Sequence, residues 1–115
     1  FNLFSHIGLV QPVETHLLSV AGTVAGCGPA FAAMFLEALS DAGVKHGLPR
    51  ALSYRLASQM LAGTAKLQLA TNAHPGQMKD AVCSPGGTTI VGVSALEKNG
   101  FRHAVIDAID AIENK

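Results

Sequence analysis

The stretch Ser84-Pro85-Gly86-Gly87-Thr88-Thr89 combines residue types that can bind an anion. It precedes an apolar run that predicts a helix starting near Thr88. The first amides of a helix have no partner inside the helix and lie at the positive end of its dipole. Glycines let these amides approach an anion, and the hydroxyls of Ser84, Thr88 and Thr89 can donate or accept hydrogen bonds. The stretch therefore predicts a cradle for a small anion, and its lack of Lys and Arg favours a carboxylate that must also be released.

A purely structural interpretation of the same stretch stays open. A Ser or Thr side chain can cap the first turn of the following helix, while the two glycines form a turn before it. In that interpretation the residues start a helix and bind nothing.

A second glycine-rich segment, Gly22 to Gly28, superficially matches a dinucleotide-binding loop. Such a loop needs a strand before it, a strand-helix-strand unit around it and an acidic residue about 20 positions further on. The sequence at that distance is "GLPR", and no strand directly precedes the glycines. We therefore predict helix packing here, with Gly26 and Gly28 allowing close approach, rather than cofactor binding.

The composition argues against several other functions. Eight basic and eight acidic residues give no net charge, and the chain has no Trp and one Tyr, which is unfavourable for nucleic-acid binding. The two cysteines form no CxxC pattern, which is typical of a reduced cytoplasmic protein. No HxxxH or HExxH pattern links the histidines, so we predict no metal site; they are His6, His16, His46, His74 and His103.

The balance of residue types predicts self-association. The 115 residues are 49% hydrophobic and 14% charged, which is more apolar surface than a small monomer can bury. We therefore expect a homodimer or a larger assembly. The segment from Thr15 to Leu36 is long enough to cross a membrane, but its hydroxyls, glycines and Pro29 fit a tightly packed protein interface better.

The pattern of apolar residues and breakers predicts an all-α chain from residue 14 onward, after a strand or extended connector over residues 1–13. A short helix at 14–20 is expected to end in the glycines at 22–28. A long helix follows, with Pro29 in its first turn and Gly43 and Gly47 at its end. Since this helix is apolar nearly all round, we expect it to be fully buried.

Four further helices are expected. The first begins with Pro49 and runs to about residue 69, and a loop at 71–76 separates it from a short helix over 78–82. A third covers about 88–98 and ends at Asn99-Gly100. The last begins near Phe101 and carries apolar residues on one side and acidic residues on the other.

Two longer segments carry a resemblance: "GPAFAAMFLEALSDAGVKHGLPR" and "AHPGQMKDAVCSPGGTTIVGVSALEKNGFRHAVIDAI". Over about residues 13–113 the chain resembles the C-terminal dimerisation domain of pyrroline-5-carboxylate reductases, most specifically at HPGQMKD, SPGGTT and GFR. The resemblance implies a helical bundle that forms an interlocked dimer, as in the C-terminal domain of the 6-phosphogluconate dehydrogenase-like superfamily. It assigns residues 13–115 to the dimerisation and substrate-binding domain and residues 1–12 to the tail of a cofactor domain. Since residue 1 is Phe, we expect the chain to be part of a longer protein.

The family resemblance also implies a reaction. NADPH or NADH delivers hydride to the C=N carbon of 1-pyrroline-5-carboxylate and yields L-proline, the last step of proline biosynthesis. The cofactor binds to an upstream Rossmann domain, so this chain alone is expected to bind no cofactor and to consume no NADPH. The implied partners are a second copy, often within a pentamer of dimers, and a small carboxylate, either pyrroline-5-carboxylate or proline.

By the same resemblance, the SPGGTT stretch holds the substrate. The backbone of Gly86, Gly87 and Thr88, together with Ser84, would bind the carboxylate. Thr89 would hydrogen-bond the ring nitrogen and help to protonate it. Ala81 would make an edge contact with the cofactor.

The chain departs from the family pattern at Ala25-Gly26-Cys27-Gly28-Pro29, where many members have SGSGP. It also departs at Thr15, Ala73 and Ala81, which stand where polar or acidic residues are frequent. Two alternatives stay open, and the departures at Thr15, Ala73 and Ala81 favour the first. One is a stand-alone helical oligomerisation module of the same fold without chemistry. The other is a helix cap that binds phosphate.

Overall fold

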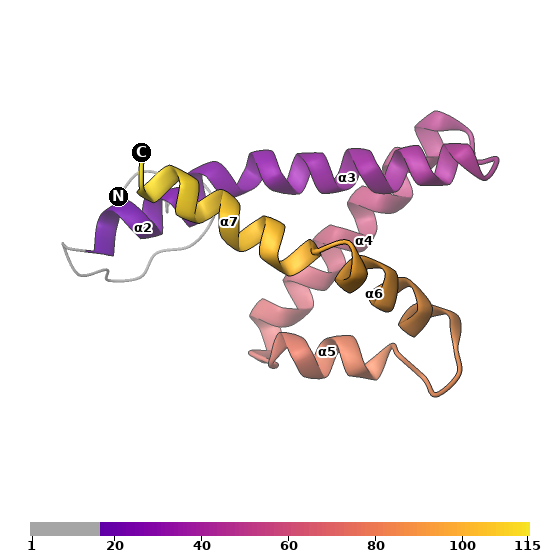
Figure 1. Cartoon of the computed structure of the whole chain (residues 1–115). Coiled ribbons are helices and arrows are strands. Elements are labelled where there is room, and N and C mark those ends of the chain that lie inside the picture. Colours follow the sequence, from indigo (N-terminus) through magenta and orange to yellow (C-terminus); the bar gives the residue numbers. More distant parts are fainter. Residues whose placement is uncertain (1–16) are drawn as a thin grey trace. The chain divides into compact units, whose positions relative to one another are not determined.

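The computed structural model describes residues 17–115, in which every regular element is a helix (Figure 1). This confirms the all-α prediction for the described residues. The predicted strand or connector at 1–13, and Thr15, lie outside them. In chain order the helices are α2 (Leu18–Gly22), the π-helix η2 (Thr23–Cys27), α3 (Gly28–Lys45), α4 (Arg50–Thr71), α5 (Pro75–Ala81), α6 (Thr88–Lys98) and α7 (Phe101–Glu113).

The described residues belong to two compact units. The first contains α2, η2, the part of α3 up to Phe35 and the part of α7 from His103 onward. The second runs from Leu36 to Arg102 and holds the rest of α3 with α4, α5 and α6.

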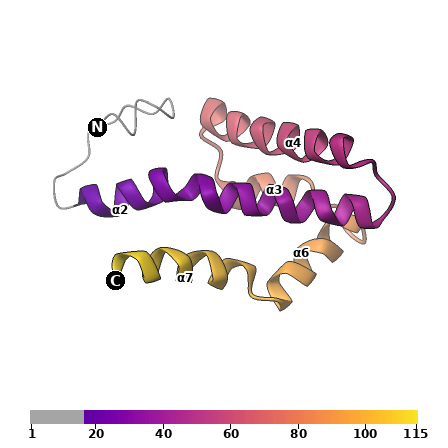
Figure 2. The ribbon, with the colours of Figure 1, turned by 90° about the horizontal axis from the view of Figure 1, so that it is seen from above.

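In the first unit, the glycines at 22–28 do not end a helix, contrary to prediction. The chain passes from α2 through the single wider turn of η2 directly into α3, as Figure 2 also shows. Glycine lowers helix stability by about 1 kcal/mol, but it does not forbid the helical conformation. The π turn keeps the helix continuous through this glycine-rich segment. A Cβ added at Gly28 would meet nothing within 4 Å, so the expected close approach is not made there within the described chain.

In the second unit, a tight turn joins α3 to α4. Gly47 adopts a φ of +106°, and the amide of Leu48 donates to the carbonyl of Gly43 at 2.9 Å. Pro49 has an extended ψ of 141° and precedes the helix as its N-cap, so α4 begins one residue later than predicted. Its first residue, Arg50, pairs with Asp41 of α3 at 2.6 Å, and this hydrogen bond raises the pKa of Arg50.

Small residues bring α3 and α4 together beyond this turn. Ser40 and Ser53 are 0% and 3% exposed, and the Ser53 hydroxyl donates to the Ser40 carbonyl at 2.8 Å. Gly43 faces the same Ser53 hydroxyl. The two helix backbones therefore approach closely here, with Ala57 buried one turn beyond Ser53.

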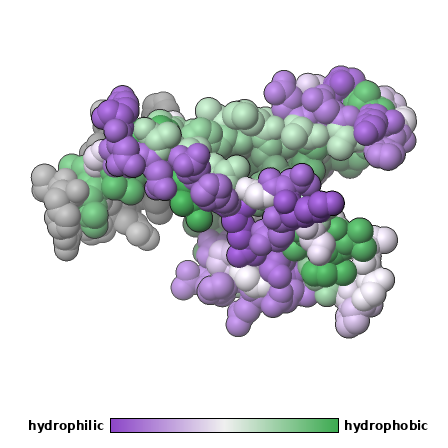
Figure 3. Space-filling model, viewed as in Figure 1, coloured by the Kyte–Doolittle hydropathy of each residue, from purple (hydrophilic) through white to green (hydrophobic). Residues whose placement is uncertain are grey.

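The apolar surface of the chain is mostly uncovered. Among the hydrophobic residues described, Ala57 is the one that is buried, and large side chains such as Met34 (67% exposed) and Leu69 (74%) are open. Green, hydrophobic surface extends along α3 and over α6 (Figure 3). The prediction that α3 is fully buried is therefore wrong for a single chain, because periodicity shows which faces are apolar but not which chain covers them.

The helical stretch Leu18–Lys45 has the length and composition to cross a membrane, and little of it is buried within the single chain. Core helices of soluble proteins can be as long and as apolar, so length and composition alone do not assign this stretch to a membrane.

The remaining helices follow the prediction with shifted ends. α4 continues to Thr71, where Asn72 in a left-handed conformation (φ 54°) ends it. α5 spans Pro75–Ala81 instead of 78–82, since His74 caps it and Pro75 takes the first position. α6 has the predicted bounds, Gly100 (φ 75°) separates it from the next helix, and α7 begins at the predicted Phe101.

Candidate anion-binding site at the start of α6

The SPGGTT stretch forms a defined turn followed at once by a helix. The amide of Gly87 donates to the carbonyl of Ser84 at 3.0 Å, which closes a four-residue turn. Pro85 occupies its second position, and Gly86 occupies its third with a φ of +70°. These are the residue types and the conformation of a type II turn.

α6 begins at Thr88 without a side-chain cap. Gly87 is the N-cap residue, and no side chain accepts a hydrogen bond from the first turn. The structure thus shows none of the Ser or Thr capping that the structural interpretation requires. The amides of Thr88, Thr89 and Ile90 are the first of the helix, and within residues 17–115 no backbone acceptor outside the helix engages them.

The Gly87 amide donates its hydrogen bond within the turn, whereas the prediction gave this amide to the ligand. The lack of a side chain at Gly87 matters instead, because a Cβ at this position would lie 2.6 Å from the Ser84 hydroxyl oxygen. A side chain at position 87 would therefore force the Ser84 hydroxyl to rotate away from this backbone.

The predicted site residues are accessible. Ser84, Gly86, Thr88 and Thr89 are exposed in the single chain, and Gly87 is half-buried. The turn and the free helix start bring the Ser84 hydroxyl and the amides of the first turn into one short segment. The Ile90 amide was missed in the sequence interpretation, although the rule that the first amides of a helix are unpaired indicates it once the helix start is placed at Thr88.

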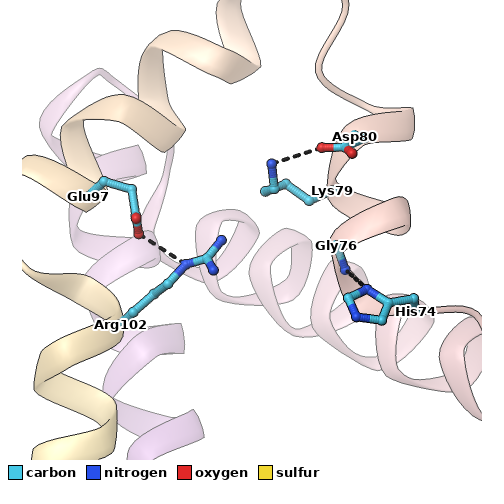
Figure 4. A network of polar contacts seen from close by, with 6 residues as sticks. All are labelled: His74, Gly76, Lys79, Asp80, Glu97 and Arg102. Atoms are coloured by element: carbon cyan, nitrogen blue, oxygen red, sulfur yellow. Dashed lines mark hydrogen bonds and ion pairs between the residues drawn. The ribbon is translucent and has the colours of Figure 1, made fainter.

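The helix before the turn, α5, has its own polar contacts (Figure 4). The Nδ1 atom of His74 accepts a hydrogen bond from the amide of Gly76 at 2.9 Å and so caps the helix start. Lys79 pairs with its neighbour Asp80 at 2.9 Å, and Arg102 pairs with Glu97 at 3.2 Å. The hydrogen bond to Asp80 raises the pKa of Lys79 above its ordinary value, so this cation already has an acidic partner.

Two of the family departures lie in this region. Ala73 follows α4, and its carbonyl accepts a hydrogen bond from the Gln68 side chain at 3.1 Å. Ala81 is the last residue of α5 and is exposed. Thr15 lies outside the described residues. A methyl group at Ala73 or Ala81 offers no polar contact to a ligand.

Within residues 17–115 no group of three or more His, Cys, Asp or Glu residues is placed to hold an ion. Cys27 and Cys83 are free thiols and half-buried. The glycine-rich segment 22–28 is helical, so it does not have the conformation of a dinucleotide-binding loop.

Comparison with known proteins identifies the family. The family model for pyrroline-5-carboxylate reductase dimerisation matches residues 15–115. A pyrroline-5-carboxylate reductase from Treponema pallidum is 55% identical over 91% of this chain, and one from Synechocystis is 51% identical over 95%. The chain spans 40% and 41% of the length of these two curated relatives.

Solved structures agree with the sequence comparison. A crystal structure of the pyrroline carboxylate reductase of Plasmodium falciparum with NADP bound matches with a TM-score of 0.86 and 38% identity. The match covers 96% of this chain and 45% of that one. A reductase from Streptococcus pyogenes also matches with a TM-score of 0.86, at 35% identity, over 90% of this chain and 40% of its own. The chain belongs to the pyrroline-5-carboxylate reductase family and corresponds to its self-associating dimerisation domain.

Proposed function

We propose that the chain is the dimerisation and substrate-binding part of a pyrroline-5-carboxylate reductase, which reduces 1-pyrroline-5-carboxylate to L-proline with NADPH or NADH. The uncapped start of α6 behind the Ser84–Gly87 turn supports this most directly, since it offers free amides to a small carboxylate. The family match over residues 15–115 supplies the chemical context.

In this proposal the substrate carboxylate accepts hydrogen bonds from the backbone amides of residues 88–90 and from the Ser84 hydroxyl. Gly86 provides the left-handed conformation of the turn, and Gly87 leaves room for Ser84. The positive end of the α6 dipole favours the anion without a fixed cation. Neutral donors also allow the product to leave.

Thr89 is the proposed catalytic residue. Its hydroxyl would hydrogen-bond the ring nitrogen while the carboxylate is held by the amides below it. A nicotinamide cofactor, when bound by the part of the protein outside this chain, supplies the hydride that adds to the C=N carbon. The electron pair of the C=N π bond would then go to nitrogen, which takes up one proton. The Thr89 hydroxyl, hydrogen-bonded to that nitrogen, would position this proton, and water would supply it, so that Thr89 itself ends the step with its hydroxyl intact.

Further parts of the proposal concern the assembly and its surroundings. The exposed apolar face of α3 would pack against protein rather than lipid, within a dimer that can assemble further. Free Cys27 and Cys83 suit a reducing compartment, which supports a cytoplasmic location. The preference for NADPH or NADH lies outside this chain.

A titration of the isotope-labelled chain with L-proline tests the cradle. We expect the largest amide shifts at residues 88–90, and smaller shifts at Gly87, whose amide is engaged in the turn. A stronger response to inorganic phosphate than to proline would support the phosphate-binding cap instead.

A chimera tests the reaction. The chain would replace the corresponding 40% of the Treponema relative, and NADPH oxidation with pyrroline-5-carboxylate would be followed. We expect turnover by the chimera and none by the chain alone. A folded, dimeric chimera that binds NADPH but gives no turnover would contradict the proposed function.

A further inference from the structure

His74 accepts all the hydrogen bonds of the first turn of α5. Pro75, the first residue of this helix, has no amide hydrogen. The amide of Gly76 donates to Nδ1 of the His74 ring at 2.9 Å, as Figure 4 shows. The amides of Gln77 and Met78 donate to the His74 carbonyl at 2.9 and 3.1 Å. The start of this helix therefore depends on one residue.

The bond to the ring depends on the protonation state of His74. A ring nitrogen accepts a hydrogen bond only when it carries no proton, and both nitrogens are donors in the imidazolium ion. Protonation therefore removes the acceptor of the Gly76 amide and places a positive charge at the positive end of the α5 dipole. His74 is exposed, so protons from solvent reach it, and histidine is the residue type whose charge ordinarily changes between pH 5 and 8.

The charged groups around α5 do not offer the protonated ring a new partner. Within residues 17–115 no salt bridge involves His74, and both carboxylates of this region are already in ion pairs. The titratable side chains of α5, of α6 and of the half of α4 that borders α5, with those of the segments that follow α5 and α6, are Asp80 paired with Lys79, Glu97 paired with Arg102, the cations Lys66 and Lys98, and the thiol of Cys83.

α5 is the element that holds Ser84 from the N-terminal side. The helix has seven residues and buries none of them within the single chain, so its stability depends on its ends. After its C-terminal end the amide of Cys83 donates to the Asp80 carbonyl at 3.1 Å. Ser84 comes next, and its carbonyl accepts the Gly87 amide that closes the turn. A continuous path of hydrogen bonds therefore leads from the His74 cap to the turn before α6.

We propose that His74 is a positioning residue for the carboxylate cradle, since its neutral ring holds α5 and thereby Ser84 in place and its protonation releases them. The inference rests on the proposed function, because it concerns the same cradle. α6 and its amides do not depend on the cap. A fall in pH should therefore weaken the binding of the substrate carboxylate, which raises KM, and change kcat little.

A pH titration of the isotope-labelled chain without ligand tests the link between the cap and the turn. Between pH 8 and 5 we expect the amide signals of Gly76 and of residues 83–87 to shift together with the ring signals of His74. His74→Asn keeps a side chain that can cap but does not titrate, so these shifts should vanish in that variant. His46→Asn, in the turn between α3 and α4, is the matched control and should keep them.

Two results of this titration would overturn the inference. Shifts confined to Gly76 would show that the cap does not reach the turn. Shifts at residues 83–87 that persist in His74→Asn would assign them to another titrating group.

Kinetics of the chimera with the Treponema relative measure the effect on the substrate. Protonation of the substrate itself affects all variants equally, so the ratio of KM in the chimera to KM in its His74→Asn variant isolates His74. We expect this ratio to rise at least about threefold between pH 8 and 6, while the two kcat values stay within about twofold of each other. A constant ratio would overturn the inference. An inactive chimera would contradict the proposed function, and the titration without ligand would still decide the inference.

Discussion

The carboxylate of Glu113, at the end of α7, accepts a hydrogen bond of 2.6 Å from the hydroxyl of Thr23 in η2. The Ser19 hydroxyl lies 3.1 Å from the same carboxylate, and Thr23 is only 6% exposed. Residues 90 positions apart are thus joined at the π turn. This contact fixes the last turn of α7 against the start of the long helical stretch.

Thr23→Val should therefore destabilise the fold. The substitution keeps the shape of the side chain but removes the donor to a charged acceptor, so we expect the free energy of unfolding to fall by about 1.5–3 kcal/mol. The Thr23 hydroxyl also lies 3.0 Å from the Ser19 carbonyl oxygen, four residues before it. Thr64→Val is the matched control, because the Thr64 hydroxyl donates to the carbonyl of Met60, also four residues before it, but contacts no carboxylate. Urea denaturation at one fixed protein concentration measures the free energy of unfolding of both variants. Equal losses in the two variants would contradict a role for Glu113.

Gly43→Ala should weaken the α3–α4 contact. The added Cβ would overlap with the Ser53 hydroxyl and lie 3.1 Å from Leu48 Cδ1. Because the Ser53 hydroxyl donates a hydrogen bond of 2.8 Å to the Ser40 carbonyl, this hydroxyl cannot move away from the added Cβ without losing that bond. We expect a loss of about 1–3 kcal/mol in the free energy of unfolding.

The double variant Gly43→Ala, Ser53→Ala separates the clash from a general effect of alanine. Removal of the Ser53 hydroxyl relieves the overlap, so the double variant should lose less than the sum of the two single variants. Strict additivity in thermal or urea unfolding would show that the overlap with Ser53 is not the cause.

Gly86→Ala should disturb the turn before α6. Gly86 has a φ of +70°, and an alanine in this left-handed region costs about 1–2 kcal/mol. We expect a loss of stability of this size and weaker binding of proline in the amide titration. Gly63→Ala, in α4 with free space around it, should instead stabilise by up to about 1 kcal/mol. Similar losses from both substitutions would argue against strain at Gly86.

His74→Ala should loosen the start of α5. The helix has seven residues, and its cap is the single bond from the Gly76 amide to His74 Nδ1. Loss of a cap costs about 0.5–2 kcal/mol, and Asn, which can also cap, should restore most of it. Hydrogen exchange of the Gly76 amide is the direct measurement. Slow exchange in His74→Ala would mean that the cap contributes little.

Much of the fold was predictable because the signals are local. α6 begins at Thr88 and ends at Lys98, and α7 begins at Phe101. The apolar pattern and the Asn99-Gly100 break predicted these positions. The Pro85-Gly86 turn follows from two residue types whose backbone preferences are nearly decisive. Such signals need no knowledge of the remaining chain.

The errors came from features that depend on distant residues. The glycines at 22–28 predicted the end of a helix, but the helix continues through them as a π turn. Within this turn the Thr23 hydroxyl donates a hydrogen bond to the distant Glu113. The apolar residues of α3 predicted that this helix is buried, but the sequence does not show that the single chain leaves these side chains exposed. In the site, the Gly87 amide was expected to bind the carboxylate, and the sequence did not indicate that this amide also donates to the Ser84 carbonyl within the turn.

Thr89→Ala tests the chemical role of the candidate site. In the chimera with the Treponema relative, loss of the hydroxyl removes the proposed donor to the ring nitrogen and keeps the helix and its amides. We therefore expect kcat to fall by about 10²-fold, the scale of a positioned acid–base group, with little change in KM. Thr89→Ser should restore most of the rate, because it returns the hydroxyl without the methyl group. Unchanged kcat in Thr89→Ala would remove Thr89 from the mechanism while leaving the carboxylate cradle, which the amides form, intact.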